Sequence, residues 1–257
     1  MTAIMVFDIE TVPDVEQGRK LLNLPEADDD AVREALKARR LLQSQGTSDF
    51  LPHYLQKIVA ISVVVRTHEW VKVWSLGETY SLEKELIERF FQGIERLKPI
   101  LVSWNGNGFD LPVLHYRSLL HSVVANRYWD VGDADPGFKW NNYLSRFHQR
   151  HTDLMDVLSG YQNRAYAPLD EIAKMLGFPG KMGMSGAEVS DQFQASNLES
   201  IRNYCETDVL NTYLIYLRFQ VIRGQLTPFE EGEECDRLKS YLRESGKPHL
   251  LEFLNLW

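Results

Sequence analysis

Two acidic side chains near the N-terminus have the spacing and the surroundings of a metal ligand pair. Asp8 and Glu10 are two residues apart in an apolar, β-branched segment. Successive side chains of a strand point to opposite faces, so residues with this spacing share a face. Hard divalent cations prefer oxygen ligands. The pair therefore suits one half of a metal site, although two solvated acids at a strand end would have the same spacing.

A phenol and a carboxylate are paired in a similar way much later in the chain. Tyr204 and Asp208 are four residues apart in a segment that we expect to be helical. Both side chains then point to the same side of the helix and can approach one ligand. By itself this spacing is weak evidence, because Tyr is often half-buried core and Asp is often a solvated helix residue.

A single acid, Asp110, follows the glycine-rich segment Asn105-Gly106-Asn107-Gly108-Phe109. An acid at the start of a helix is by default a cap that interacts with the helix dipole. Joint occurrence changes this interpretation, because the strand acids, the loop acid and the helical Tyr/Asp pair each lie on the type of element that a shared site requires. The set of five residues indicates one acidic site more specifically than any of its members does.

The elements that must position these residues are strands early in the chain and helices later. The predicted strands cover residues 4–10, 58–65, 69–75 and 99–104. The predicted helices cover residues 81–97 with Ser81 as N-cap, a segment from about residue 110, and residues 153–160, 169–176 and 198–219. Residues 125–143 are expected to be irregular. We expect the polar segment from Asp14 to Leu55 to be a helical insertion that covers one edge of the sheet.

Length and composition favour one soluble domain. The chain has 257 residues, of which 44% are hydrophobic and 25% charged, and it has no apolar stretch long enough to cross a membrane. The first ten residues do not resemble a signal peptide, so Cys205 and Cys235 are expected to be reduced thiols in a cytoplasmic protein. A net charge of −8 argues against a nucleic-acid coat protein. An enzyme that binds phosphate through metal ions needs less surface basicity.

Two further motifs are weak indications of function. His148 and His151 are three residues apart, but neither cysteine has a spacing that would complete a zinc site. The segment from Gly180 to Gly186 contains Lys181 followed by Met, where a phosphate-binding P-loop requires Ser or Thr. Lys181 is therefore either a contact for a substrate phosphate or a solvated loop lysine.

Three strings carry a resemblance to a known family. Phe7–Thr11 (FDIET), Trp104–Asp110 (WNGNGFD) and Tyr204–Asp208 (YCETD) resemble the three motifs of the DEDD superfamily of 3′-5′ exonucleases, particularly the exonuclease domain of family B DNA polymerases. The chain resembles still more closely a stand-alone bacterial family of predicted exonucleases related to that domain, over residues 4–219. Asn203 stands where the DEDDh subclass has His, and Tyr204 is typical of the DEDDy subclass.

The resemblance implies a fold and an activity. The fold is an RNase H-like α/β fold with a mixed five-stranded sheet flanked by helices, and the first acidic pair lies on its central strand. Residues 1–224 would form the exonuclease domain, including the insertion 14–55, and residues 225–257 a helical extension packed on it. The implied activity is hydrolysis of single-stranded nucleic acid from its 3′ end, with DNA favoured, to nucleoside 5′-monophosphates. The implied cofactors are two divalent cations, Mg²⁺ or Mn²⁺.

The resemblance also assigns a role to each residue. Asp8, Glu10 and Asp208 would ligate the first metal, Asp8 would also bridge to the second, and Asp110 would hold the second largely through water. Tyr204 would orient the attacking water. The resemblance further implies contacts with the terminal nucleotide for Thr11, Asn105 and Phe109. It implies a supporting role for His151 and Asp153. Asn105 could equally be a turn residue, and Phe109 a core residue. The rival functions are an RNA-processing exonuclease with the same chemistry and an inactive nucleic-acid-binding protein.

Overall fold

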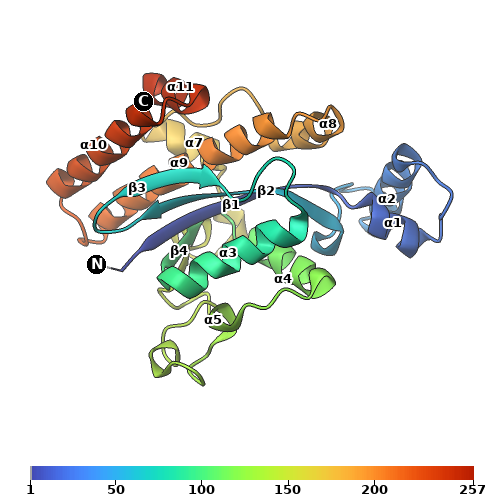
Figure 1. The fold of residues 1–257 in the computed structure, drawn as a ribbon, viewed down its shortest axis with the longest axis horizontal. Coiled ribbons are helices and arrows are strands. Elements are labelled where there is room, and N and C mark those ends of the chain that lie inside the picture. The colour runs from blue at the N-terminus through green and yellow to red at the C-terminus, as the bar shows by residue number, and fades with distance from the viewer. Residues whose placement is uncertain (1) are drawn as a thin grey trace.

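The computed structural model describes residues 2–257 and contains a mixed five-stranded sheet. The strand order is β3-β2-β1-β4-β5, with β1 in the centre. Figure 1 labels the first four strands of this order. The central strand pairs antiparallel with β2 and parallel with β4. The strands are β1 (Ile4–Pro13), β2 (Gln56–Arg66), β3 (Val71–Ser75), β4 (Ile100–Ser103) and β5 (His151–Asp153). The expected α/β class and the mixed five-stranded sheet are confirmed.

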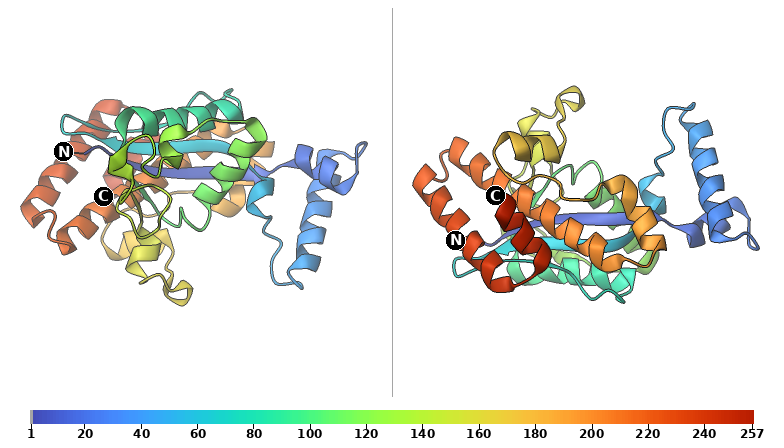
Figure 2. Two further views of the ribbon diagram at one scale, coloured as in Figure 1. Left: turned by 90° about the horizontal axis from the view of Figure 1, so that it is seen from below. Right: turned by 90° about the horizontal axis from the view of Figure 1, so that it is seen from above.

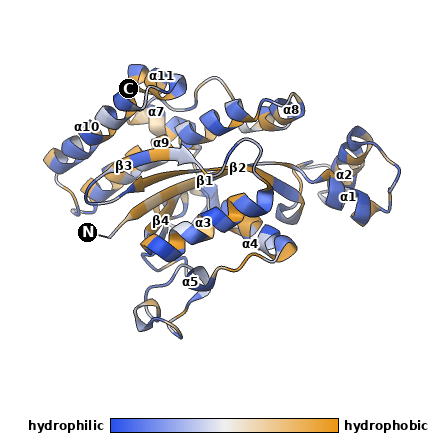
Figure 3. Ribbon diagram, in the orientation of Figure 1, coloured by the Kyte–Doolittle hydropathy of each residue, from blue (hydrophilic) through white to orange (hydrophobic). Residues whose placement is uncertain are grey.

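Helices cover both faces of the sheet, and alternation along β1 decides which side chains face which layer. Met5, Phe7 and Ile9 are buried in the cluster that includes α3 (Glu83–Leu97) and α4 (Asp110–His121). Val6 points the other way, into the cluster around α9 (Leu198–Ile222). Figure 3 shows hydrophobic colour concentrated in the strands between these layers. With a period of two, Asp8 and Glu10 are placed on the α9 side.

The remaining elements are short or lie outside the sheet layers. They are α1 (Val15–Leu22), α2 (Asp29–Gln43), η1 (His53–Leu55), α5 (Asn126–Trp129), η2 (Pro136–Phe138), α6 (Leu154–Leu158), η3 (Asn163–Ala165), α7 (Leu169–Met175), η4 (Gly186–Glu188), α8 (Val189–Gln194), α10 (Pro228–Ser245) and α11 (Pro248–Leu256). Among residues 2–257, no helix has both the length and the apolar character needed to cross a membrane.

Two local predictions were wrong. The N-cap of α3 is Leu82 and not Ser81, whose hydroxyl accepts instead from the backbone N–H of Glu78 at 2.9 Å. The hydroxyl therefore closes the preceding turn and not the helix. The helix predicted over residues 153–160 begins only at Leu154, because His151–Asp153 pairs with β4 as the fifth strand.

The insertion 14–55 does not cover an edge of the sheet, contrary to our expectation. Figures 1 and 2 show α1 and α2 projecting beyond the far end of β1 as an arm. The arm has a small core of its own, formed by Val32, Leu36, Leu51 and Leu55. The apolar residues of the insertion are therefore buried in this core, away from the sheet. We call residues 14–55 the arm from here on.

A buried ion cluster fixes the base of the arm. The Asp14 Oδ2 atom lies 2.6 Å from an Arg117 nitrogen, and a second nitrogen of the same guanidinium lies 2.6 Å from Glu83 Oε2. All three side chains are almost fully buried. Because α4 supplies Arg117 and α3 supplies Glu83, the arm is joined to the layer that packs under β1.

The C-terminal helices pack against α9 and cover the outer edge of β3. Tyr241 donates to the Val73 carbonyl at 2.9 Å, and Glu206 accepts from the Ser75 N–H at 2.9 Å. Glu206 is also bonded to Lys247 and His249. Side chains from α9 and α10 thus satisfy backbone groups that an exposed edge strand would offer to other chains.

Candidate active site

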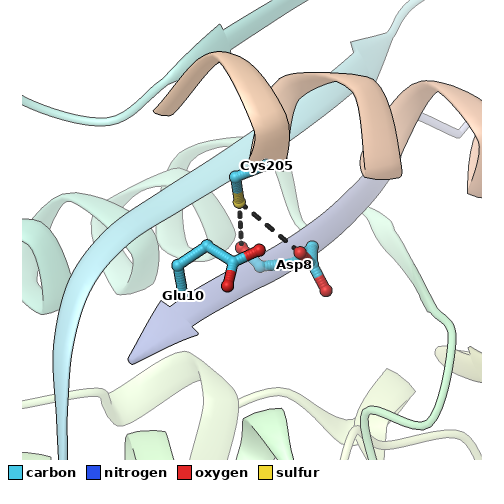
Figure 4. Close-up of side chains that lie close together, drawn as sticks. All are labelled: Asp8, Glu10 and Cys205. Carbon is cyan, nitrogen blue, oxygen red and sulfur yellow. Dashed lines mark hydrogen bonds between the residues drawn. The ribbon is translucent and has the colours of Figure 1, made fainter. Parts of the chain in front are cut away.

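The first acidic pair lies on β1 and faces α9, where it meets a cysteine (Figure 4). Asp8, Glu10 and Cys205 each offer one potential ligand atom, and these atoms all lie within 4.8 Å of one another. The Cys205 sulfur is 3.5 Å from both the carbonyl and the Oδ2 atom of Asp8. Sulfur is a soft ligand, whereas hard cations prefer oxygen. The two carboxylates are therefore the better donors for Mg²⁺ or Mn²⁺.

The second pair approaches the same place from α9. Asp208 is only 5% exposed and Tyr204 4%. Within residues 2–257, Asp208 Oδ1 is buried and has no hydrogen-bond partner. A buried carboxylate oxygen without a partner is costly unless a ligand binds it. An all-carboxylate donor set with such an oxygen fits a divalent cation.

Asp110 reaches the site from the start of α4. Its Oδ1 atom accepts a hydrogen bond from the backbone N–H of Ile9 at 3.1 Å. This bond forms because β4 pairs with β1 only at residues 4–6, so β4 does not reach the Ile9 amide. The bond holds the carboxylate against β1 between the positions of Asp8 and Glu10, which a simple helix cap would not do.

Lys181 is a cation within the acidic site. Its ammonium group donates to the Tyr204 hydroxyl and lies 3.7 Å from Asp208 Oδ2. The loop that carries it is pinned to α9, because the Asn211 amide both accepts from the Gly180 N–H at 3.1 Å and donates to the Gly180 carbonyl at 2.8 Å. Lys181 remains exposed at the surface, but its ammonium group is paired with Tyr204 and Asp208. The glycine-rich loop was its only sequence signal.

Burial raises the pKa of all four carboxyl groups, and repulsion by the other members of the set adds to it for Asp8 and Glu10. Burial is the main cause for Asp8, followed by the negative charges of Asp110 and Asp208. Burial also leads for Glu10, followed by the charge of Asp8. The pKa of Asp110 rises to about 7 through burial, and that of Asp208 to about 6 through burial, which Lys181 partly offsets. A site that raises carboxyl pKa values in this way favours a bound cation.

The pKa of the Tyr204 hydroxyl is also raised, first by burial and then by the charge of Asp208. The phenol therefore keeps its proton throughout the physiological pH range. Lysine has only donors, so the phenol oxygen accepts from Lys181, and the phenol O–H is directed to the Asp208 carboxylate, which accepts it.

A buried carboxylate shapes the loop between β4 and α4. The two oxygens of Asp153 accept from the backbone N–H groups of Asn105 at 2.9 Å and Asn107 at 2.8 Å. Asn105 has a φ of 65°, and a Cβ on Gly106 would lie 2.2 Å from Ser103 Oγ, so this turn depends on its residue types. The loop in turn orients Phe109 and Asp110.

The two histidines considered as zinc ligands have separate structural roles. His151 Nε2 lies 2.8 Å from Ser103 Oγ, and burial lowers the pKa of its imidazole to about 4. His148 accepts from the Asn142 N–H at 3.0 Å. Among the His, Cys, Asp and Glu side chains that the structure describes, one group of three lies close enough together to hold a metal ion. Its members are Asp8, Glu10 and Cys205.

Two of the three residues predicted to contact substrate, Thr11 and Phe109, line one pocket beside the carboxylates. Thr11 donates to the Gln56 side chain at 3.0 Å, and the Phe109 ring is half-buried. A pocket of about 480 Å³ is lined by Glu10, Thr11 and Phe109, together with Phe50 and Lys37 of the arm. The side chain of Asn105 does not line this pocket. The sequence offered no chemical signal for Phe50 or Lys37, which belong to a segment interpreted as an insertion.

The fold and the sequence are similar to those of DNA polymerases. A family B DNA polymerase from Pyrobaculum calidifontis superposes with a TM-score of 0.51 at 16% identity, covering 99% of this chain and 27% of the polymerase. This likeness shows the fold. Residues 48–257 match the family model described as a predicted 3′-5′ exonuclease related to the exonuclease domain of PolB. The chain belongs to this family.

Curated relatives match over a shorter stretch. A catalytic subunit of DNA polymerase epsilon from Arabidopsis thaliana is 23% identical over 142 residues, which are 53% of this chain and 6% of the polymerase. A DNA polymerase of Archaeoglobus fulgidus is 25% identical over 165 residues, 62% of this chain and 20% of that protein. The chain thus spans a small fraction of these relatives. The family match begins after the string at residues 7–11 and includes the other two motif strings.

Proposed function

We propose that this protein is a 3′-5′ exonuclease of the DEDDy subclass that acts on the 3′ end of single-stranded nucleic acid, with DNA preferred, and releases nucleoside 5′-monophosphates. One observation carries the proposal. Four carboxylates from a strand, a helix start and a second helix converge on one site, in which a buried Asp208 oxygen has no partner within residues 2–257. Family membership supports the same activity.

The carboxylates would hold two divalent cations, Mg²⁺ or Mn²⁺. Asp8, Glu10 and Asp208 are the donors proposed for one, and Asp8 with Asp110, the latter largely through water, for the other. When bound, such a pair of cations activates water near neutral pH and offsets the charge that develops on the leaving 3′ oxygen.

The other side chains act on the water and the substrate. We assign the protonated Tyr204 hydroxyl, which accepts from Lys181, to orienting the attacking water. The Lys181 ammonium also offers a positive charge to the scissile phosphate. The Asp153 carboxylate holds the loop that presents Phe109, on which the base of the terminal nucleotide would stack, and we assign Thr11 and Asn105 to further contacts with that nucleotide.

An end-labelling assay tests the activity. Single-stranded DNA, single-stranded RNA and a duplex with a mismatched 3′ end, each labelled at the 5′ end, are incubated with Mg²⁺, Mn²⁺ or chelator. We expect a ladder that shortens from the 3′ end in either metal and no change in chelator, with DNA degraded faster than RNA. Faster degradation of RNA would reverse the proposed preference.

Variants connect the activity to the site. Asp8→Ala and Asp208→Ala should each lose at least a hundredfold in rate, because each removes a proposed metal ligand. Glu244→Ala, which removes an exposed acid on α10, is the matched control and should keep the wild-type rate. Retention of full activity by Asp8→Ala, or absence of nucleotide release by the wild-type protein in every metal, would refute the proposal.

A further inference from the structure

The arm forms part of the pocket that adjoins the acidic site. This pocket of about 480 Å³ follows β1 from Ile9 to Pro13, the part of the strand beyond its pairing with β4. Phe109 forms one wall, and Gly186 and Ser190 contribute another. Phe50 and Lys37 of the arm also line it. The pocket therefore extends from a proposed metal ligand, Glu10, to the arm, and its volume is in the range of small-molecule sites.

Phe50 is an exposed aromatic side chain whose backbone is fixed. Its ring centroid is 5.7 Å from that of Phe109, yet 56% of the residue is exposed. Arg40 donates to the Phe50 carbonyl at 2.9 Å, and Gln56 donates to the Leu51 carbonyl at 3.0 Å. A large aromatic ring held at the mouth of a pocket is a suitable surface for stacking a nucleic-acid base.

Charge at the arm end of the pocket is mixed. Lys37 and Asp49 both line it, and Lys37 also lies 3.2 Å from Glu34. Lys37 is exposed and can turn toward a phosphate, but it does not make this region strongly basic. Affinity for a strand would therefore depend more on stacking against Phe50 than on phosphate neutralisation.

We propose that the arm provides a subsite in which Phe50 stacks against the base next to the terminal nucleotide, while Lys37 contacts its phosphate. The proposal rests on the exonuclease activity proposed above. Proceeding from Glu10, the strand would meet Phe109 at the terminal base and Phe50 at the next one. A base that stacks on Phe50 must leave its own helix, so the subsite selects single-stranded 3′ ends.

Kinetics on two substrates separate the subsite from catalysis. The p-nitrophenyl ester of thymidine 5′-monophosphate has no neighbouring nucleotide, whereas a ten-residue oligothymidylate has one. We expect Phe50→Ala to lower the ratio of kcat/KM for the oligonucleotide to that for the ester about tenfold, mainly through KM, since one base–aromatic stack is lost. Phe50→Trp should preserve the ratio. Phe229→Ala, which removes a ring that is 74% exposed on α10, is the control and should leave it unchanged.

An abasic oligonucleotide identifies the contacting base. An abasic residue next to the terminal nucleotide should lower the wild-type rate about as much as Phe50→Ala does, and the two changes together should cost no more than either one. Additive losses would show that Phe50 does not contact that base. Lys37→Gln should lower the same ratio by a smaller factor, about threefold, and an unchanged ratio would remove Lys37 from the subsite.

The two proposals fail in different ways. Hydrolysis of both substrates by the wild-type protein, with an unchanged ratio in Phe50→Ala, overturns the subsite and leaves the exonuclease intact. If the wild-type protein hydrolyses neither substrate, the proposed activity fails, and equilibrium binding of the fluorescein-labelled oligonucleotide in Ca²⁺ decides the subsite. Affinity about tenfold weaker in Phe50→Ala supports it, and equal affinities overturn it. Phe50→Leu, which keeps an apolar side chain, gives the same comparison should the alanine variant be unstable.

Discussion

Replacing Asp208 by Asn should stabilise the metal-free protein at alkaline pH. In the folded protein the pKa of Asp208 is about 6, raised first by burial, and the ordinary value of an Asp carboxyl is 3.8. Ionisation of this group therefore costs folding free energy. Since one pKa unit corresponds to about 1.4 kcal/mol, the difference of about two units gives on the order of 3 kcal/mol at pH 8. The loss of the ion pair with Lys181 makes this an upper value.

The direction of the pH dependence follows from the raised pKa. Below about pH 4 the carboxyl is protonated in both folded and unfolded chains and costs nothing. The cost grows as the pH rises toward about 6 and is constant above that. The stability difference between Asp208→Asn and wild type should therefore be largest at pH 8 and smaller at pH 5. For a domain of this size, about 3 kcal/mol corresponds to a Tm difference of roughly 6 to 12 °C.

Metal should narrow the stability difference between Asp208→Asn and wild type. A ligand that binds only the folded state stabilises it by RT ln(1 + [L]/Kd), about 2.7 kcal/mol at a hundredfold excess over Kd. Wild type should gain this stabilisation with Mg²⁺ or Mn²⁺, and Asp208→Asn should gain less because it lacks one carboxylate donor. Thermal unfolding followed by circular dichroism, at pH 5 and pH 8 with chelator or metal, measures all of these differences.

The control is Asp236→Asn, which neutralises an exposed acid on α10 and should change the Tm little in any condition. The reasoning would be refuted if Asp208→Asn were less stable than wild type in chelator at pH 8. It would also be refuted if their difference did not shrink at pH 5, because burial of the carboxylate would then not be the source of the cost.

Three other substitutions test the remaining parts of the site and its support. Tyr204→Phe should lower kcat on the order of a hundredfold while the metal-induced rise in Tm is retained, and an unchanged kcat would show that the hydroxyl is idle. Asp153→Ala leaves the amides of Asn105 and Asn107 without their acceptor. We therefore expect the free energy of unfolding, measured in urea, to fall by about 2 to 4 kcal/mol, and kcat/KM to fall as well. Arg117→Met leaves two buried carboxylates without their cation and should lower the free energy of unfolding by about 3 to 5 kcal/mol. A smaller loss than that caused by the same substitution at the exposed Arg243 would contradict the anchoring role.

Periodicity was sufficient to predict a central strand and the faces on which the acidic residues lie. The run from Ile58 to Val65 is apolar at every position but Ser62, as a central strand with both faces covered requires, and it forms most of β2. The two-residue spacing of Asp8 and Glu10 correctly placed both on one face of β1. The four-residue spacing of Tyr204 and Asp208 correctly placed both toward the same region, where Lys181 contacts both. Each of these inferences depends on local geometry alone.

Features that depend on tertiary pairing could not be predicted in this way. His151–Asp153 is a strand only because β4 is beside it, and three residues are too few for an alternating pattern. The direction of the arm depends on the pairing of Asp14 with Arg117, which are about a hundred residues apart in sequence. The contact of Lys181 with Tyr204 depends on the bonds between Asn211 and Gly180, for which the sequence has no spacing rule.

The distribution of charge is compatible with the proposed action of a protein with a net charge of −8 on a polyanion. Four of the 36 acidic residues are gathered at the proposed point of cleavage, where their raised pKa values indicate that burial disfavours the charged form in the absence of a cation. Metal binding would convert their repulsion of a phosphate into attraction at the point of cleavage. Beyond this point the proposed contacts are aromatic, at Phe109 and Phe50, and stacking does not require a basic surface. An acidic surface would then disfavour binding along a duplex while a single-stranded end remains bound through metal ions and stacked bases.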